Sequence, residues 1–458
     1  MLFHTWTFLI FFAVFLSVYT LLMQTKWRIP WLLLASYVFY GWWNPLFLIL
    51  IVYATLVDWF VGIRLSVSSK RKSWLVFGLC NNLFLLGFFK YAGFFTENLQ
   101  FLFTILHIPV NVPVPNIFLP VGISFFTFQS MSYIIDAYRN IIPTERSLMR
   151  YAAYVALFPQ MVAGPIERAK AILPQLHKTP VITKIDISDG ISLFVTGLFK
   201  KAVMADFLAV YVDKVYGSPD TFSSAALVFA TYAFAWQIYF DFSGYTDMAR
   251  GTARMMGIKL MLNFNNPYTA VDIGDFWRRW HISLSSWFKD YVYIPMGGNK
   301  TVKYKIWQNV FLTMLISGFW HGAAWTYVIW GALNGLGRLL SLGFEKTDFY
   351  VKKVPKIIKQ LIVFHFICLT WIFFRAASLS EALLIIKRIF SCIGGNAQVP
   401  MVMLLLTVAI WGYQLIFNSS FSKVLEHRVC RVGAAVLAII LVIALSSSVQ
   451  KQFIYFQF

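Results

Sequence analysis

The sequence predicts an all-α protein that crosses a lipid bilayer many times. Hydrophobic residues make up 59% of its 458 positions and charged residues 13%, and the mean hydropathy is +0.67. Soluble globular domains do not have such a balance, so lipid must be the solvent for most of the chain. Apolar stretches of the roughly 20 residues that span hydrocarbon recur along the whole sequence, and we count about ten or eleven of them.

The clearest predicted spans are long apolar runs with few or no charged side chains. They cover residues 5–23, 30–62, 74–89, 117–135, 222–240, 357–374, 401–417 and 432–445. The run 30–62 is long enough for two spans, and the sequence GWWNP at 41–45 predicts a turn between them at the membrane surface. Polar intervals such as 167–189 are too short to bury a core of their own. We therefore expect residues 1–458 to form a single membrane domain.

The formal net charge of +20 raises the question of a nucleic-acid partner. Such a protein would concentrate its basic side chains on one water-facing surface. Here they are dispersed among short loops, which include 26–28, 64–72, 139–150 and 300–305. The positive-inside rule places loops of this kind in the cytosol. We therefore expect membrane lipids around a multi-pass protein, and no nucleic acid.

Polar residues gather inside the apolar pattern between positions 237 and 299. Because a polar group in hydrocarbon is costly, each of them is by default a candidate site residue. The candidates in this cluster are Asp241, Asn265, Arg278, Arg279 and Lys289. For the three basic residues two interpretations are open. They can lie in amphipathic helices at the membrane surface, or they can line a cytosolic mouth that binds phosphates, for which the arginine fork is suited.

Residues 306–337 contain no Asp, Glu, Lys or Arg and carry one histidine, His321, near their centre. As one helix this stretch would be about 48 Å long, more than a crossing needs, so we expect it to tilt, bend or divide near its glycines. A lone histidine on an apolar helix is most often a packing residue. Here small residues surround it, and Gly318 with Gly322 forms a G-x-x-x-G, which by itself indicates helix packing only.

Imidazole chemistry gives a reason for a histidine at such a place. It titrates near cellular pH, so a buried, neutral His321 can accept a proton from a reacting hydroxyl. His281 is a second candidate, and an interfacial histidine beside Trp280 is an equal alternative. Other chemistries lack support, because the sequence has no phosphate loop, no H-E-x-x-H and no G-x-S-x-G. The four cysteines show no C-x-x-C spacing, so we predict no metal site.

Several runs of the sequence resemble the membrane-bound O-acyltransferase family. They are FWRRWHISLSSW at 276–287, DYVYIPMGGN at 290–299 and SGFWHGAAW at 317–325, with three more at 119–129, 158–166 and 241–247. All of them lie between residues 117 and 337. They look most like the branch that O-acetylates bacterial polysaccharides such as alginate.

The resemblance implies a helical bundle around a central tunnel, with re-entrant or amphipathic helices between the spans. It implies that acetyl-CoA enters from the cytosol as a substrate, that no cofactor is tightly bound, and that the acceptor approaches from the other face. His321 then matches the family's catalytic histidine, and His281 matches the second histidine of this branch. We expect substrate contacts from Trp280, Trp320, Gly322, Asp241, Asn265, Arg278, Arg279 and Lys289.

The implied setting is the bacterial cytoplasmic membrane. There such a subunit passes acetyl groups outward, to an extracytoplasmic acetyltransferase or to polysaccharide-export proteins. A related branch moves D-alanine from a carrier protein onto teichoic acids, and other branches acylate lipids or proteins, so the acceptor stays open. A polysaccharide transporter would also place polar residues at mid-membrane but would make no bond. Release of coenzyme A separates the enzyme from the transporter.

Overall fold

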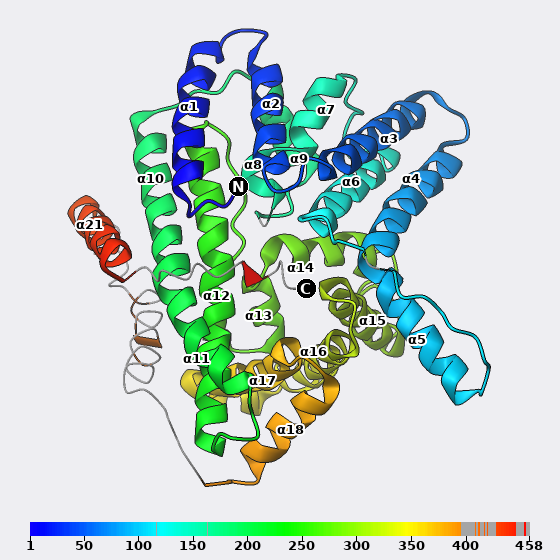
Figure 1. Ribbon diagram of the computed structural model, residues 1–458, viewed down its shortest axis with the longest axis vertical. Coiled ribbons are helices and arrows are strands. Elements are labelled where there is room, and N and C mark those ends of the chain that lie inside the picture. Colours follow the sequence, from blue (N-terminus) through cyan, green and yellow to red (C-terminus); the bar gives the residue numbers. More distant parts are fainter. Residues whose placement is uncertain are drawn as a thin grey trace. The chain divides into compact units, whose positions relative to one another are not determined.

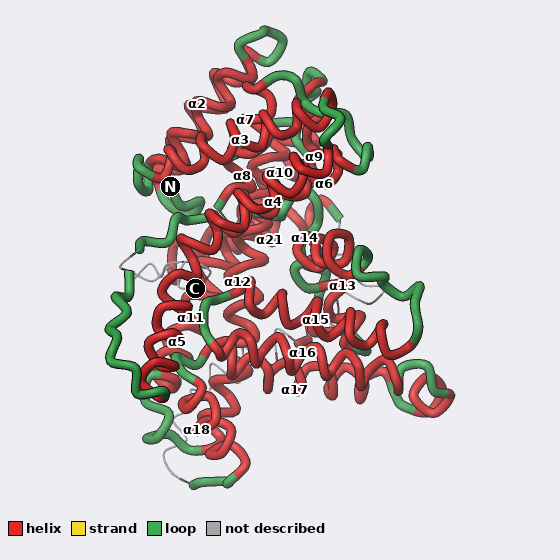
Figure 2. The backbone as a smooth tube through the Cα atoms, turned by 90° about the vertical axis from the view of Figure 1, so that its right-hand side faces the viewer, coloured by secondary structure: helices red, strands yellow, loops and turns green. Residues whose placement is uncertain are grey.

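The structure, a computed structural model, describes residues 1–115, 117–162, 164–394, 427–445 and 453–454, with isolated positions between 408 and 419. In this part of the chain every regular element is a helix and no strand occurs (Figure 1, Figure 2). The predicted all-α class is therefore confirmed for the described residues.

The chain divides into two compact units. Unit 1 comprises Met1–Ile191 and Ala249–Met261, and unit 2 comprises Ser192–Met248 and Leu262–Phe458. The helices of unit 1 are α1 (Trp6–Leu22), α2 (Arg28–Gly41), α3 (Phe47–Val67), α4 (Arg71–Leu86), α5 (Ala92–Ile105), α6 (Ile123–Tyr138), α7 (Leu148–Val155), α8 (Phe158–Met161) and α9 (Ala169–His177). The single membrane domain stays a prediction.

Helices α10 (Lys184–Phe199) and α12 (Ser224–Met255) contribute residues to both units. The other helices of unit 2 are α11 (Asp206–Tyr216), α13 (Ile273–Arg279), α14 (Ile282–Phe288), α15 (Lys303–His321), α16 (Trp325–Phe344), α17 (Lys356–Arg375), α18 (Leu379–Phe390) and α21 (Arg428–Leu445). Short π-helical segments are η1 (Gly87–Tyr91), η2 (Lys200–Ala205), η4 (Lys289–Tyr293) and η5 (Phe349–Lys353). The segment η3 (Pro267–Thr269) is one turn of 3-10 helix.

Several predicted spans appear as helices with nearly the predicted bounds. Residues 5–23 form α1, 357–374 form α17, and 432–445 form most of α21. The run 30–62 divides into α2 and α3, as predicted. The turn between them is stabilised by Asn44, whose Oδ1 accepts a hydrogen bond from the backbone N–H of Leu46 at 3.0 Å. The span predicted at 401–417 lies outside the described residues, apart from isolated positions.

Three predicted bounds are wrong. The span at 74–89 continues as one helical stretch, Arg71–Ile105, and the span at 222–240 continues as α12 to Met255. Polar residues lower the hydropathy there, but a helix continues through them because its backbone hydrogen bonds are internal. The helix expected at 117 begins only at Ile123, after Gly122 turns the chain with a φ of 77°.

Three helical stretches of the described chain are long and apolar enough to cross a bilayer by themselves. They are Phe47–Val67, Arg71–Ile105 and Lys356–Arg375. Two apolar stretches, Trp6–Leu22 and Val432–Ile443, are shorter. The predicted total of about ten or eleven crossing helices therefore stays a prediction.

The uncharged stretch 306–337 divides near its glycines, as predicted. Helix α15 ends at His321, α16 begins at Trp325, and the two helices pack side by side (Figure 1). Their backbones approach closely at Gly318 and Gly331. A Cβ on Gly318 would lie 2.8 Å from the Cα of Gly331, so the contact has no room for a side chain. Gly318 therefore packs the two helices together.

Replacing Gly331 by alanine should destabilise the protein. Its Cβ would lie 2.6 Å from the carbonyl oxygen of Met314, and overpacking of this kind costs about 1–3 kcal/mol. We expect a lower unfolding temperature in detergent, measured by loss of the monodisperse peak on size-exclusion chromatography after heating. Gly343→Ala on the same helix is the control, because a Cβ there meets nothing within 4 Å. Equal behaviour of the two variants would contradict the tight contact.

Candidate functional site

His321 is the last residue of α15 and is buried at the turn into α16, with 3% of its surface exposed. Aromatic rings enclose its imidazole: the ring centroids of Trp320 and Trp330 lie 5.0 Å away, and that of Phe374 lies 5.4 Å away. Gly322 follows directly, where a Cβ would lie 2.1 Å from an aromatic ring of α16. The small residue thus lets the turn close around the imidazole.

His281 lies between α13 and α14 in a strained backbone conformation, with a φ of 44°. A non-glycine residue in this left-handed region persists only where its surroundings hold it. Two backbone hydrogen bonds do so. The N–H of Ile282 donates to the carbonyl of Asn263, and the N–H of Asn265 donates to the carbonyl of Arg279, both at 2.9 Å. The side chain of His281 is fully buried, so the turn fixes the direction of its imidazole.

Asn263 determines which nitrogen of His281 carries the proton. Its Oδ1 accepts hydrogen bonds from the backbone N–H and the Oγ of Ser283, at 3.1 and 2.9 Å, and lies 3.2 Å from Nδ1 of His281. Because a backbone N–H only donates, the accepting amide atom must be the oxygen, and Nδ1 must carry a hydrogen. The lone pair of the imidazole is then on Nε2. The prediction from sequence missed Asn263, although it belongs to the same short polar run as Asn265.

Burial lowers the pKa of His281 to about 3, because the charged imidazolium would lose its hydration. The residue lies in the turn between two short helices, outside the apolar spans. At cellular pH its imidazole is therefore neutral. A group with so low a pKa is a weak general base near pH 7, so His281 is better suited to accepting a hydrogen bond than to removing a proton.

Trp320 connects the two histidines. Its ring centroid lies 5.0 Å from that of His321 and 6.4 Å from that of His281. Phe242 of α12 also contacts His281, with ring centroids 4.6 Å apart. The structure thus brings both predicted histidines into one aromatic cluster of unit 2, a question that their spacing in the sequence left open.

Trp280 belongs to the same cluster. Its ring lies 5.1 Å from that of Trp371, which stacks on Trp330 at 5.7 Å. Each of these three side chains is 1% exposed. Their contacts are aromatic packing, which excludes water from the surroundings of His321; direct substrate contact by Trp280 and Trp320 stays a prediction.

A cavity of about 860 Å³ lies in unit 2 next to this cluster. It is lined by Trp277, whose ring lies 5.7 Å from that of Trp330, and by Ser317, one helical turn before His321. Among the described lining residues, neither His281 nor His321 appears. The indole of Trp330 therefore contacts both Trp277 of the cavity wall and the imidazole of His321.

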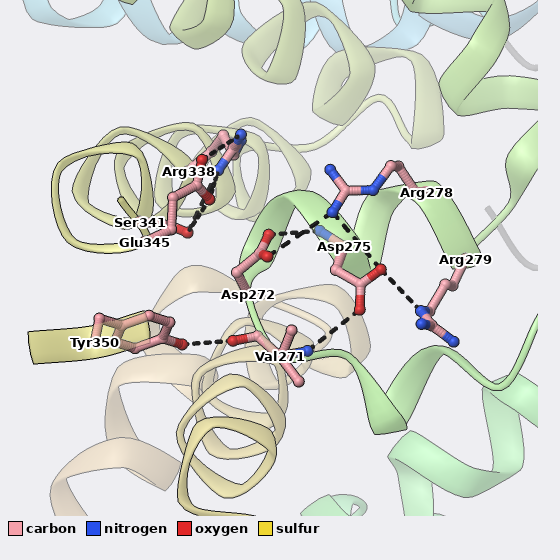
Figure 3. A network of polar contacts seen from close by, with 9 residues as sticks. All are labelled: Val271, Asp272, Asp275, Arg278, Arg279, Arg338, Ser341, Glu345 and Tyr350. Carbon is pink, nitrogen blue, oxygen red and sulfur yellow. Dashed lines mark hydrogen bonds and ion pairs between the residues drawn. The ribbon is translucent and has the colours of Figure 1, made fainter. Parts of the chain in front are cut away.

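Four basic side chains line the cavity: Arg278, Lys289, Arg338 and Lys346. Arg278 is 65% exposed, and its Nη2 lies 3.7 Å from Asp275, a distance at which an exposed pair is weak (Figure 3). Arg279 is outside the lining, and its Nε donates to Asp275 at 2.9 Å. This placement favours phosphate binding for Arg278 and Lys289 and a structural role for Arg279.

Arg338, which the sequence analysis missed, is held against α13 by a glycine. A Cβ on Gly274 would lie 2.7 Å from its guanidinium carbon. Glu345 fixes the other side of the group, with Nη1 and Oε2 2.7 Å apart, and Ser341 lies beside it (Figure 3). Its position in the sequence could have indicated it, because Arg338 is the first charged residue after the uncharged stretch 306–337.

Asp241 and Asn265 lie outside the described cavity lining, and substrate contact by either stays a prediction. Asn265 is exposed. Asp241 is buried, with its Oδ1 2.7 Å from Nζ of Lys201, which also lies 2.8 Å from Asp206. The cost of desolvating these charges offsets much of their attraction, so the ion pairs are weak evidence for stability. Within the described residues, no three His, Cys, Asp or Glu side chains are grouped to hold a metal ion.

Comparison with known proteins decides the family. Residues 137–380 match the model of the membrane-bound O-acyltransferase family. The chain is 40% identical over 390 residues to the probable alginate O-acetylase AlgI of Pseudomonas aeruginosa, which covers 83% of this chain and 73% of that protein. The chain belongs to the membrane-bound O-acyltransferase family. It is therefore an acyltransferase enzyme and a membrane protein, as the resemblance of its motifs predicted.

Two other relatives show how the family varies around this chain. The peptidoglycan O-acetyltransferase of Helicobacter pylori is 38% identical over 394 residues, 78% of this chain and 72% of that protein. The teichoic acid D-alanyltransferase of Bacillus subtilis is 32% identical over 275 residues, 56% of this chain and 68% of that protein. The family match includes α13 to α17, and therefore both histidines and the basic cavity.

Replacing Asn263 by alanine should destabilise the His281 turn. The donors of Ser283 and His281 would lose their acceptor in a buried place, which costs about 1–3 kcal/mol. We expect a lower unfolding temperature and lower acyltransferase activity. Asn265→Ala is the matched control for stability, since that side chain is exposed, and it should unfold at the wild-type temperature. If the two variants unfold at the same temperature, the hydrogen bonds of Asn263 do not hold the turn.

Proposed function

We propose that this enzyme takes acetyl groups from cytosolic acetyl-CoA for O-acetylation of a cell-surface or exported polysaccharide such as alginate. The observation that carries the proposal is the buried His321, which packs on Trp330, and the contact of Trp330 with Trp277 in the wall of a cavity lined by four basic side chains. The names of the P. aeruginosa and H. pylori relatives support acetyl as the group and a carbohydrate polymer as the acceptor.

In the proposed reaction, His321 removes the proton of the acceptor hydroxyl while the hydroxyl oxygen attacks the thioester carbonyl. The new C–O bond replaces the C–S bond, and the departing thiolate takes up the proton, so His321 returns to its neutral form. His281 and Asn263 position groups around this centre. The aromatic cluster keeps bulk water from competing with the acceptor as the nucleophile.

The cavity is suited to the phosphate end of the proposed donor. Its volume of about 860 Å³ lies in the range of sites for small molecules. Arg278 offers a planar guanidinium fork for phosphate oxygens, and Lys289 and Lys346 add charge without a fixed geometry. The fork of Arg338 is paired with Glu345 and helps to shape the wall. The thioester end would then point toward Trp330 and His321.

The proposed setting is the bacterial cytoplasmic membrane. The partners would be an extracytoplasmic acetyltransferase or polysaccharide-export proteins that complete the modification, and no tightly bound cofactor is required. The relative named for D-alanyl transfer supports a second candidate, in which the donor is a carrier-bound thioester and the acceptor a teichoic acid. Family membership counts against a transporter without acyl chemistry.

The first test is the release of free coenzyme A from acetyl-CoA by the protein in nanodiscs. A general base contributes about 10²–10⁴-fold to a rate, so His321→Ala should lose activity by that factor, and His281→Ala by less. His365→Ala is the control, because His365 is exposed on α17 and its ring bonds to Tyr232.

Wild-type rates in folded His321→Ala protein would overturn the role of His321. If the wild type releases no coenzyme A but does use a carrier-bound D-alanyl thioester, the teichoic-acid candidate replaces the acetyl proposal.

The variants Arg278→Gln and Arg279→Gln test whether the basic cavity of unit 2 binds the acetyl-CoA donor. Arg278 lines the cavity and Arg279 does not. A hydrogen bond to a charged group is worth about 1.5–3 kcal/mol, so Arg278→Gln should raise the KM for acetyl-CoA at least tenfold, with little change in kcat. Arg279→Gln should leave KM unchanged. An equal rise of KM in both variants would show that the effect is not specific to the cavity.

A further inference from the structure

A second cavity, of about 890 Å³, lies entirely in unit 1. It is formed by the loop after α6, the first turn of α7 and one face of α9. On α9 five residues line the cavity: Ala169, Lys170, Leu173, Pro174 and His177. The last four stand at i, i+3, i+4 and i+7 and therefore share one helix face. The proposed acyl transfer gives this cavity no role.

The cavity has an excess of positive charge. Its one lining carboxylate, Glu145, is 5% exposed and pairs with Nη1 of Arg150 at 3.0 Å and Nε2 of His177 at 2.6 Å. Three other basic side chains line the same cavity and form no ion pair within the described part of the chain: Arg146, Lys170 and Lys178. Glu145 therefore anchors one side of the cavity, and three charges remain to attract an anion.

The surroundings of the cavity combine these charges with exposed apolar side chains. Ile141, which lines the cavity, is 52% exposed, and Met149 nearby in the chain is 56% exposed. Ile142 and Leu173 add buried apolar surface to the wall. Basic side chains beside exposed apolar ones are typical of the membrane–water interface. The positive-inside rule places this loop on the cytosolic side, where the leaflet carries anionic lipids.

We propose that this cavity binds the headgroup of an anionic phospholipid. Arg146, Lys170 and Lys178 would contact the phosphate, and the apolar wall at Ile142 and Leu173 would receive the first carbons of the acyl chains. Basic pockets at the cytosolic ends of membrane helices bind anionic headgroups in this way. The lipid would hold the α6–α7 loop and α9 of unit 1 against the membrane surface.

The test uses the full chain in a non-ionic detergent with water-soluble short-chain phosphatidylglycerol. A bound ligand stabilises the folded state, so the rise of the unfolding temperature with lipid concentration gives the affinity. The variant is R146Q with K170Q and K178Q, and the control is K26Q with K70Q and K72Q. The control residues are exposed lysines of unit 1 outside the cavity lining. Each charge near an anionic headgroup is worth about fivefold, so the variant should bind on the order of a hundredfold more weakly, whereas the control should bind like the wild type.

Phosphatidylcholine of the same chain length and inorganic phosphate should bind far more weakly than phosphatidylglycerol. The ligand-free unfolding temperature of the variant should equal that of the wild type, since the three side chains are exposed. Equal affinities for the two lipids, or an unchanged affinity in the variant, would overturn the proposal. Inorganic phosphate that binds as tightly as phosphatidylglycerol would assign the cavity to a soluble phosphate instead, and displacement by a polyglutamate peptide at equal concentration would assign it to an acidic protein segment.

Discussion

The backbone contact between α15 and α16 fixes the geometry on which the candidate site depends. Two helix backbones can approach this closely only where the residues at the contact are small. Gly318 and Gly331 meet this requirement. With the helices this close, the chain reverses between His321 and Trp325, and Trp330 lies against the imidazole of His321. A larger side chain at the contact would separate these two rings.

Internal hydrogen bonding is the second constraint, and it explains where the polar residues lie. A buried polar group needs a partner within the protein. The side-chain oxygen of Asn263 accepts hydrogen bonds from Ser283 and His281. Lys201 forms ion pairs with both Asp206 and Asp241. Two backbone hydrogen bonds, from Ile282 to Asn263 and from Asn265 to Arg279, hold His281 in its left-handed conformation. The strain at that turn is thus sustained by residues that sequence reasoning would treat as ordinary polar positions.

The sequence predicted correctly those features that depend on residues close together in the chain. It predicted the all-α class, the break at Gly41–Pro45, the division of 306–337 near its glycines, and both histidines as candidates. It missed what depends on pairing between distant segments. The length of α12 was underestimated because internal partners stabilise its polar residues. Asn265 was chosen over Asn263 because spacing does not show which amide faces His281, and Arg338 was missed because its contact with Gly274 joins two helices far apart in the chain.

In this arrangement the basic side chains line the cavity, and His321, the proposed proton acceptor, is outside its described lining. A cation in contact with an imidazole makes it a weaker proton acceptor, because two positive charges repel. The basic side chains of the cavity lie on α13, at the start of η4, on α16 and just after α16, while aromatic rings surround His321. Trp277 of the cavity wall contacts Trp330, which contacts His321. The same protein can therefore attract the phosphates of the proposed donor without weakening the histidine that is proposed to remove the acceptor's proton.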